Sequence, residues 1–156
     1  MTPREIYQRY GAIVFRRARR LLGDEQAAKD ACQEVFLRLF RSLPEFERAS
    51  PMTWLYTVTT NHCLNLIRDE QRHRKLLAAN AATIPNAAVT PSLATLLRGF
   101  PEELQAIAVY YFVDEMSQAE IANVLGISQR TVSNRLVAFR NLAKTAFASD
   151  AMEEPC

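Results

Sequence analysis

Apolar residues recur every three or four positions along most of this chain, and this spacing constrains the fold more than any other feature. Ala27, Ala31, Val35 and Leu39, for example, follow one another at intervals of four residues. Such a stripe faces one side of an α-helix, whereas a half-buried β-strand needs alternation at every second residue. Only 4 glycines among 156 residues interrupt the pattern, and 49% of the residues are hydrophobic. The sequence therefore predicts an all-α protein that can bury a core.

Local capping signals predict three helices in the first half of the chain. Thr2 and Glu5 can form a capping box around Pro3, so the first helix is expected to run to about Arg20 and to stop at Gly23. Two further helices are expected between Asp24 and Ser42 and from Met52 to about Lys75, with a short loop at residues 45–47 between them.

The segment from Leu76 to Leu97 contains no charged residue and predicts a domain boundary. Pro85 and Pro91 break any long helix within it, and it offers little apolar surface to offset the entropy lost on ordering. We therefore expect two small helical bundles joined by a flexible linker. The expected divisions are a first domain at residues 1–77, a linker at 78–91, a second domain at 92–147 and a frayed tail at 148–156.

The segment 117–136 carries the strongest functional signal. Ser117 and Glu120 can form a capping box, Gly126 can leave the first helix with positive φ, and Ser128 can cap a second helix. This spacing predicts a helix-turn-helix whose second helix can enter a major groove. A helical hairpin without a DNA ligand would share the periodicity, but the polar outward face favours DNA binding. The candidate contacts with bases or phosphates are Ser128, Gln129, Arg130, Thr131, Ser133, Asn134, Arg135 and Arg140.

Two motifs in the first half point to a family. Residues 30–38 read Asp-Ala-Cys-Gln-Glu-Val-Phe-Leu-Arg, and residues 54–56 read Trp-Leu-Tyr, with Asn61 and Arg68 downstream. Both motifs resemble those of the extracytoplasmic-function (ECF) sigma factors, which are bacterial transcription initiation factors. Residues 104–140 resemble the region of that family that reads the −35 promoter element. The resemblance extends over nearly the whole chain, and the motifs occur in the same order as in that family.

The resemblance implies partners and site residues. The second helix would dock on the clamp coiled coil of RNA polymerase through Asp30, Gln33, Glu34 and Leu37. The third helix would open and read the −10 element through Thr57, Thr60, Asn61, Asn65 and Arg68, and a base-capturing loop would fall between Phe46 and Thr53. The expected partners are core RNA polymerase, promoter DNA and an anti-sigma factor, and no cofactor or metal is expected.

The residues themselves are compatible with these roles. Phe36 and Leu39 of the second helix, and Trp54, Leu55 and Val58 of the third, are expected to face the core. Some positions depart from the family pattern: Asn65 stands where aspartate is usual, Thr60 where arginine is common, and Ser133 and Ala138 where cations are often found. Each missing cation predicts about one phosphate contact fewer.

Two other classes of function are alternative interpretations of the sequence. A conventional helix-turn-helix regulator would use its N-terminal half for sensing or dimerisation and would bind an operator with two-fold symmetry. A hydrolase that pairs Cys63 with His62 or His73 is disfavoured, since adjacent helical residues point about 100° apart, so we expect no enzyme.

Location is predicted from what the sequence lacks. No apolar run approaches the ~18 residues of a membrane span, and no signal-peptide pattern opens the chain. We therefore expect a cytoplasmic protein in which Cys32, Cys63 and Cys156 are reduced thiols.

Overall fold

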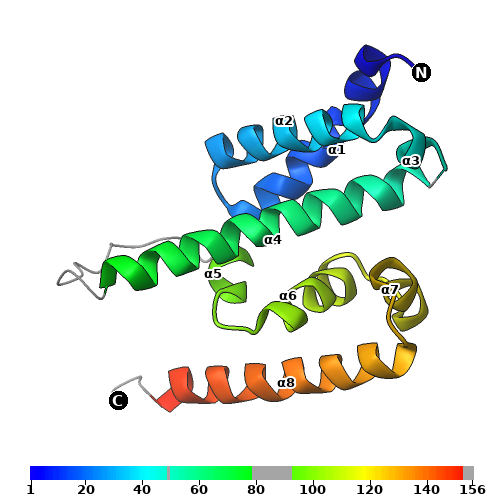
Figure 1. The fold of residues 1–156 in the computed structure, drawn as a ribbon. Helices are drawn as coiled ribbons and strands as arrows, with labels where there is room; N and C mark the ends of the chain where they lie inside the picture. Colours follow the sequence, from blue (N-terminus) through cyan, green and yellow to red (C-terminus); the bar gives the residue numbers. More distant parts are fainter. Residues whose placement is uncertain (49, 79–92, 153–156) are drawn as a thin grey trace. The chain divides into compact units, whose positions relative to one another are not determined.

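A computed structural model describes residues 1–48, 50–78 and 93–152 (Figure 1). These ranges are helical and contain no strand, which confirms the all-α prediction. The chain divides into two compact units, Met1–Gly99 and Phe100–Cys156. The predicted linker lies outside the described residues from position 79 onward. None of the described helices is long and apolar enough to cross a membrane.

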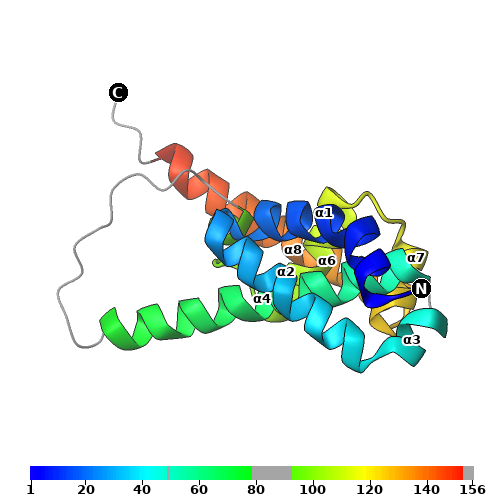
Figure 2. The ribbon, with the colours of Figure 1, turned by 90° about the horizontal axis from the view of Figure 1, so that it is seen from above.

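The first unit contains helices α1 (Pro3–Leu22), α2 (Glu25–Arg41), α3 (Leu43–Arg48), α4 (Pro51–Ala78) and α5 (Leu93–Leu97). The predicted caps are present. Thr2 and Glu5 form a capping box, and Gly23 ends α1 at a φ of 74°. The Asp24 carboxylate then accepts the backbone N–H of Ala27 at 2.8 Å and starts α2. Helices α1 and α2 pack on each other and on α4 (Figure 2).

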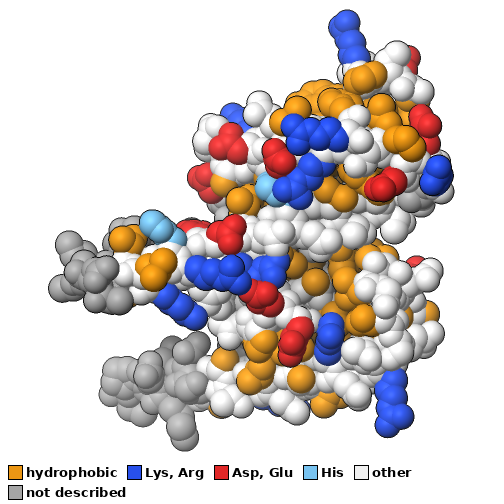
Figure 3. All heavy atoms as spheres, in the orientation of Figure 1, with side chains coloured by type: hydrophobic (Ala, Val, Ile, Leu, Met, Phe, Trp, Pro, Cys, Tyr) orange, Lys and Arg blue, Asp and Glu red, His pale blue; other side chains and the backbone are white. Residues whose placement is uncertain are grey.

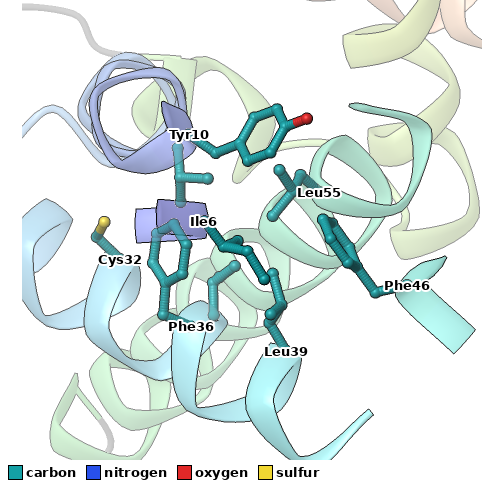
Figure 4. Close-up of a cluster of buried hydrophobic side chains, with 9 residues drawn as sticks. Ile6, Tyr10, Cys32, Phe36, Leu39, Phe46 and Leu55 are labelled. Carbon is teal, nitrogen blue, oxygen red and sulfur yellow. The ribbon is translucent and has the colours of Figure 1, made fainter. Parts of the chain in front are cut away.

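One hydrophobic cluster holds these helices together (Figure 4). Helix α1 supplies Ile6 and Tyr10, and α2 supplies Phe36 and Leu39, both buried as predicted. Leu55 of α4 is buried, while Trp54 and Val58 are half-buried and pack against the same cluster. Burying a side chain of this size contributes about 1.5–3 kcal/mol, so the cluster fixes the outward faces of α2 and α4.

Two short helices differ from the sequence prediction. The segment expected to be a loop at residues 45–47 lies in α3, because Phe46 is buried with its ring 6.2 Å from Tyr10 and 5.7 Å from Trp54. Helix α5 was expected to begin the second domain, yet it packs on α1 within the first unit. Its end is held to α4 because Arg98 pairs with Glu70 at 2.9 Å.

The second unit contains α6 (Glu102–Ala108), a π-helical turn η1 (Val109–Val113), α7 (Gln118–Leu125) and α8 (Gln129–Met152). Its core joins these elements through Ile107, Tyr110, Ile121, Val132 and Leu136. Helix α8 continues through residues 148–152, which were expected to form a frayed tail. The rest of that tail, residues 153–156, lies outside the described part of the chain.

Candidate functional site

The segment 117–136 forms the predicted helix-turn-helix. Ser117 and Glu120 form a capping box at the start of α7, and Gly126 ends that helix at a φ of 66°. Ser128 Oγ accepts the backbone N–H of Thr131 at 3.1 Å and starts α8. Val132 and Leu136 are buried against α7, so their turns of α8 present the opposite face to solvent.

Of the predicted DNA-contacting residues, Arg130 and Asn134 lie most nearly opposite the buried pair, whereas Gln129 and Arg140 lie closer to it around the helix. Ser128, Gln129, Arg130, Asn134 and Arg140 are exposed, while Thr131, Ser133 and Arg135 are half-buried. Arg130 and Arg135 are five residues apart and therefore about 140° apart around the helix, so they face different parts of a groove.

Arg140 has neighbours that the sequence did not reveal. Its guanidinium lies 5.6 Å from the centre of the Tyr111 ring and 6.0 Å from that of Phe112. Both rings belong to η1, almost thirty residues earlier in the chain, so the periodicity of α8 carries no sign of them. Contact with an aromatic face restricts the motion of a guanidinium while leaving its charge exposed.

On α2, the predicted polymerase-contacting residues lie on one outward stripe. Asp30, Gln33 and Leu37 are exposed, and Glu34 is half-buried and accepts a hydrogen bond from Arg38 at 3.1 Å. The Leu37 side chain is 49% exposed, which is unusual for a leucine among charged neighbours. Figure 3 shows acidic and basic side chains side by side over α2, with a histidine next to them.

Two residues from other helices lie close to α2, and sequence reasoning missed both. Tyr7 of α1 meets Phe36 edge-on at 4.9 Å between ring centres and remains 52% exposed. On α4, burial lowers the pKa of His62, Arg38 lowers it further, and Glu34 opposes the shift. His62 is therefore close enough to feel both charges of the Glu34–Arg38 pair.

On α4, four of the five predicted −10 contacts share an outward face. Asn61 and Asn65 are exposed, and Arg68 is half-buried and donates a hydrogen bond to the Asn65 side-chain oxygen. Thr57 is half-buried, and its hydroxyl donates to the Thr53 carbonyl at 2.8 Å. The spacing of the four residues places them within about 80° around the helix.

The fifth residue, Thr60, does not belong to this face. Its side chain is fully buried, and its hydroxyl oxygen accepts hydrogen bonds from Arg17 Nε and Nη2 at 2.9 and 2.6 Å. The guanidinium of Arg17 lies 4.4 Å from the centre of the Tyr56 ring. Thr60 therefore links α1 to α4, and we remove it from the set of DNA contacts.

The described cysteines carry no sign of nucleophilic chemistry. Cys32 and Cys63 are free and buried, and burial raises the pKa of Cys63 to about 12 and that of Cys32 in the same direction. A thiol with a raised pKa stays protonated near neutral pH and is a poor nucleophile. Cys156 lies outside the described residues. Within those residues, no three His, Cys, Asp or Glu side chains group as metal ligands.

Two family models match separate parts of the chain. The family "Sigma-70 region 2" matches residues 6–73, and "Sigma-70, region 4" matches residues 96–143. The chain therefore has the two regions that define a sigma-70-type protein, and its first half matches region 2 rather than a sensing domain.

Similar proteins show which group of sigma-70-type proteins the chain is related to. The chain is 31% identical over 145 residues to the ECF RNA polymerase sigma factor SigL of Mycobacterium tuberculosis, covering 85% of this chain and 81% of SigL. It is 25% identical to SigM of Bacillus subtilis, covering 99% of this chain and all of SigM. It is also 28% identical to SigE of Mycolicibacterium smegmatis over 96% of this chain, which spans 63% of the length of SigE. The chain belongs to the ECF sigma factor family.

Solved structures share the fold. CnrH, solved in complex with the cytosolic domain of CnrY, is 23% identical with a TM-score of 0.64, covering 95% of this chain and 88% of CnrH. RpoE from Bartonella quintana, solved with the anti-sigma factor NepR, is 16% identical with a TM-score of 0.60, covering 94% of this chain and 97% of RpoE.

Proposed function

We propose that this chain binds core RNA polymerase in the cytoplasm and directs promoter-specific transcription initiation, as an initiation factor and not an enzyme. One observation carries the proposal. Helices α2, α4 and α8 each leave a polar face exposed, two in the first compact unit and one in the second. A protein that must bind both a polymerase and two separate DNA elements needs three such faces.

The stripe on α2 is the proposed polymerase contact. Asp30, Gln33 and Glu34 supply hydrogen-bonding and charged groups around the exposed Leu37. An apolar side chain inside a polar rim is typical of the centre of a protein interface, where burial of the apolar group provides affinity and the rim provides specificity.

The outward face of α4 is the proposed contact with the −10 element. Thr57, Asn61 and Asn65 offer hydrogen-bond donors and acceptors, and Arg68 adds a positive charge beside them. Unstacked bases are captured by side chains that bond their edges, next to a basic wall that neutralises their phosphates. This face therefore suits a melted strand better than a closed duplex.

The outward face of α8 is the proposed contact with the −35 element. We assign Gln129, Arg130 and Asn134 to base edges in the major groove, because they are exposed near the start of the helix. Arg135 and Arg140 are assigned mainly to phosphates. Tyr111 and Phe112 would then orient the Arg140 guanidinium toward the DNA backbone.

An anti-sigma factor is the proposed negative regulator. Support comes from the similar fold of RpoE, which was solved in complex with the anti-sigma factor NepR. An anti-sigma factor that covered the stripe on α2 or the outward face of α4 would prevent polymerase or DNA binding.

The direct test is transcription by core RNA polymerase supplemented with this protein, with mapping of start sites. Initiation at defined sites that depends on the added protein is the expected result. Asp30→Lys with Glu34→Lys should weaken core binding about tenfold or more without loss of helicity, because surface charges and i,i+4 pairs such as Glu34–Arg38 contribute little to folding. Glu45→Lys with Glu47→Lys is the control, since it changes the charge equally at exposed positions on α3. Equal core binding by the two double variants would refute the assignment of α2.

A further inference from the structure

A second basic surface lies on α1, apart from the faces already assigned. Arg9, Arg16 and Arg20 are all exposed. They are seven and four residues apart, so they lie within about 40° of one another around the helix. From Arg9 to Arg20 the stripe is ~16 Å long, about the rise of five nucleotides on one strand of a duplex. We call these three residues the α1 arginine stripe.

The charges of this stripe are not neutralised within the described residues. Some basic side chains elsewhere in the first unit pair with carboxylates one turn away: Lys29 with Glu25 at 3.0 Å, and Arg74 with Glu70 at 2.8 Å. Among the described side chains, none forms an ion pair with an arginine of the α1 stripe. Within α1 itself, the one acidic residue is Glu5, one turn before Arg9.

Glu5 offsets only part of this charge, because it is one carboxylate against three guanidinium groups and is held in the capping box at the start of the helix. Its Oε2 accepts the backbone N–H of Thr2 at 2.7 Å in the capping box. That hydrogen bond lowers the pKa of the Glu5 carboxyl, so the group stays ionised and contributes one negative charge near Arg9. The stripe therefore presents a net positive face over three turns of α1.

The helix that carries the stripe contacts α4, next to the proposed −10 contacts. Arg17, next to Arg16 in the chain, turns inward and reaches Thr60 and Tyr56 of α4. Thr60 is adjacent to Asn61, so α1 and α4 are linked at the turn that carries a proposed base contact.

We propose that the α1 arginine stripe binds the phosphate backbone of promoter DNA beside the segment held by α4. Guanidinium groups bind phosphate through two parallel hydrogen bonds, and a row of them follows a regularly charged backbone. A backbone of regular negative charge fits such a row better than an acidic protein surface does, where carboxylates alternate with cations. The proposal rests on the proposed function, because it places a DNA strand on α4.

The test compares two double variants with the same change in net charge. Arg16→Gln with Arg20→Gln removes two arginines of the stripe. Arg4→Gln with Lys29→Gln is the control: Arg4 is exposed about 140° around α1 from Arg9, and Lys29 is an exposed, paired residue of α2. Each protein is assembled with core polymerase, and its affinity for a fork-junction promoter DNA is measured over a series of salt concentrations.

The stripe variant should bind core polymerase normally but promoter DNA more weakly. Its plot of log affinity against log salt should be shallower by about 1.4 to 1.8, because each lost phosphate contact removes about 0.7 to 0.9 from the slope. The control should keep the wild-type slope. Equal slopes for the two double variants would overturn the proposal, as would a stripe variant that loses core binding, since the stripe would then contact protein.

A second probe separates this proposal from the proposed function. The free proteins are titrated with a mixed-sequence DNA duplex at low salt, which requires neither polymerase nor a promoter. If wild-type protein fails to direct initiation, the proposed function is wrong. A shallower salt dependence of duplex binding by the stripe variant would still support phosphate binding by the α1 arginine stripe. Equal salt dependence of all three proteins on both DNAs would refute it.

Discussion

The guanidinium of Arg17 donates two hydrogen bonds to the hydroxyl oxygen of Thr60, at 2.9 and 2.6 Å, and thereby joins α1 to α4. The two residues are 43 positions apart in the chain. Because Thr60 is fully buried, its hydroxyl serves the packing of the first unit, and the neighbouring Asn61 remains available to solvent.

Thr60→Val should therefore destabilise the first unit without changing any DNA contact. Valine keeps the shape but removes the acceptor of two hydrogen bonds from a charged group, which costs about 1–3 kcal/mol. Chemical denaturation followed by the fluorescence of Trp54 measures this change. Thr57→Val, on the outward face, is the control and should cost less than about 0.5 kcal/mol. Equal stabilities of the two variants would contradict the structural role of Thr60.

Asn61→Ala should impair strand opening and leave −35 binding unchanged, because Asn61 lies in the other compact unit. Transcription from duplex and from pre-melted templates separates the steps, and the defect should be large on the duplex and small on the pre-melted template. Gln8→Ala, an exposed amide on α1, should behave as wild type. A defect of equal size on both templates would remove Asn61 from the opening step.

Arg130→Ala and Arg135→Ala should affect −35 binding in different ways. Loss of Arg130 should cost about 1–3 kcal/mol at one base pair and relax the preference there. Loss of Arg135 should weaken binding evenly across sequences and make the salt dependence shallower by about 0.9. Binding to a library of single-base variants at two salt concentrations distinguishes these outcomes. An even loss for Arg130→Ala would reassign it to the phosphates.

Glu115→Gly should stabilise the second unit. Glu115 has a φ of 53°, which costs a residue with a side chain about 1 kcal/mol relative to glycine. Gly126→Ala is the opposite change: Gly126 has a φ of 66° and no atom within 4 Å of an added Cβ, so its cost comes from the backbone alone. Amide exchange in α7 and α8 should slow in the first variant and quicken in the second. Faster exchange in Glu115→Gly would mean that the Glu115 side chain stabilises the second unit by more than its positive φ destabilises it.

The features predicted correctly from sequence are those decided by neighbours in the chain. Capping boxes at Thr2 and Ser117 and the positive φ of Gly126 involve residues within one turn of each other. Helical periodicity likewise identified Phe36 and Leu39 as core residues, since the buried side of a helix repeats every three to four positions. Together with the motif at residues 30–38, these signals identified the family.

Other features required the tertiary structure, because they depend on residues far apart in the chain. The sequence alone determined the long helices, the helix-turn-helix and the family, since local hydrogen bonds and periodic burial are encoded within a few residues. Thr57, Thr60 and Asn61 are all polar, so the pattern of α4 does not show that Thr60 faces inward; Arg17 decides it. Phe46 made a helix of an expected loop by packing between Tyr10 and Trp54, and Glu70 holds Arg98 beside α4. Such choices follow from which distant side chains can satisfy a buried polar group or fill a gap in the core, and only the packed structure decides that.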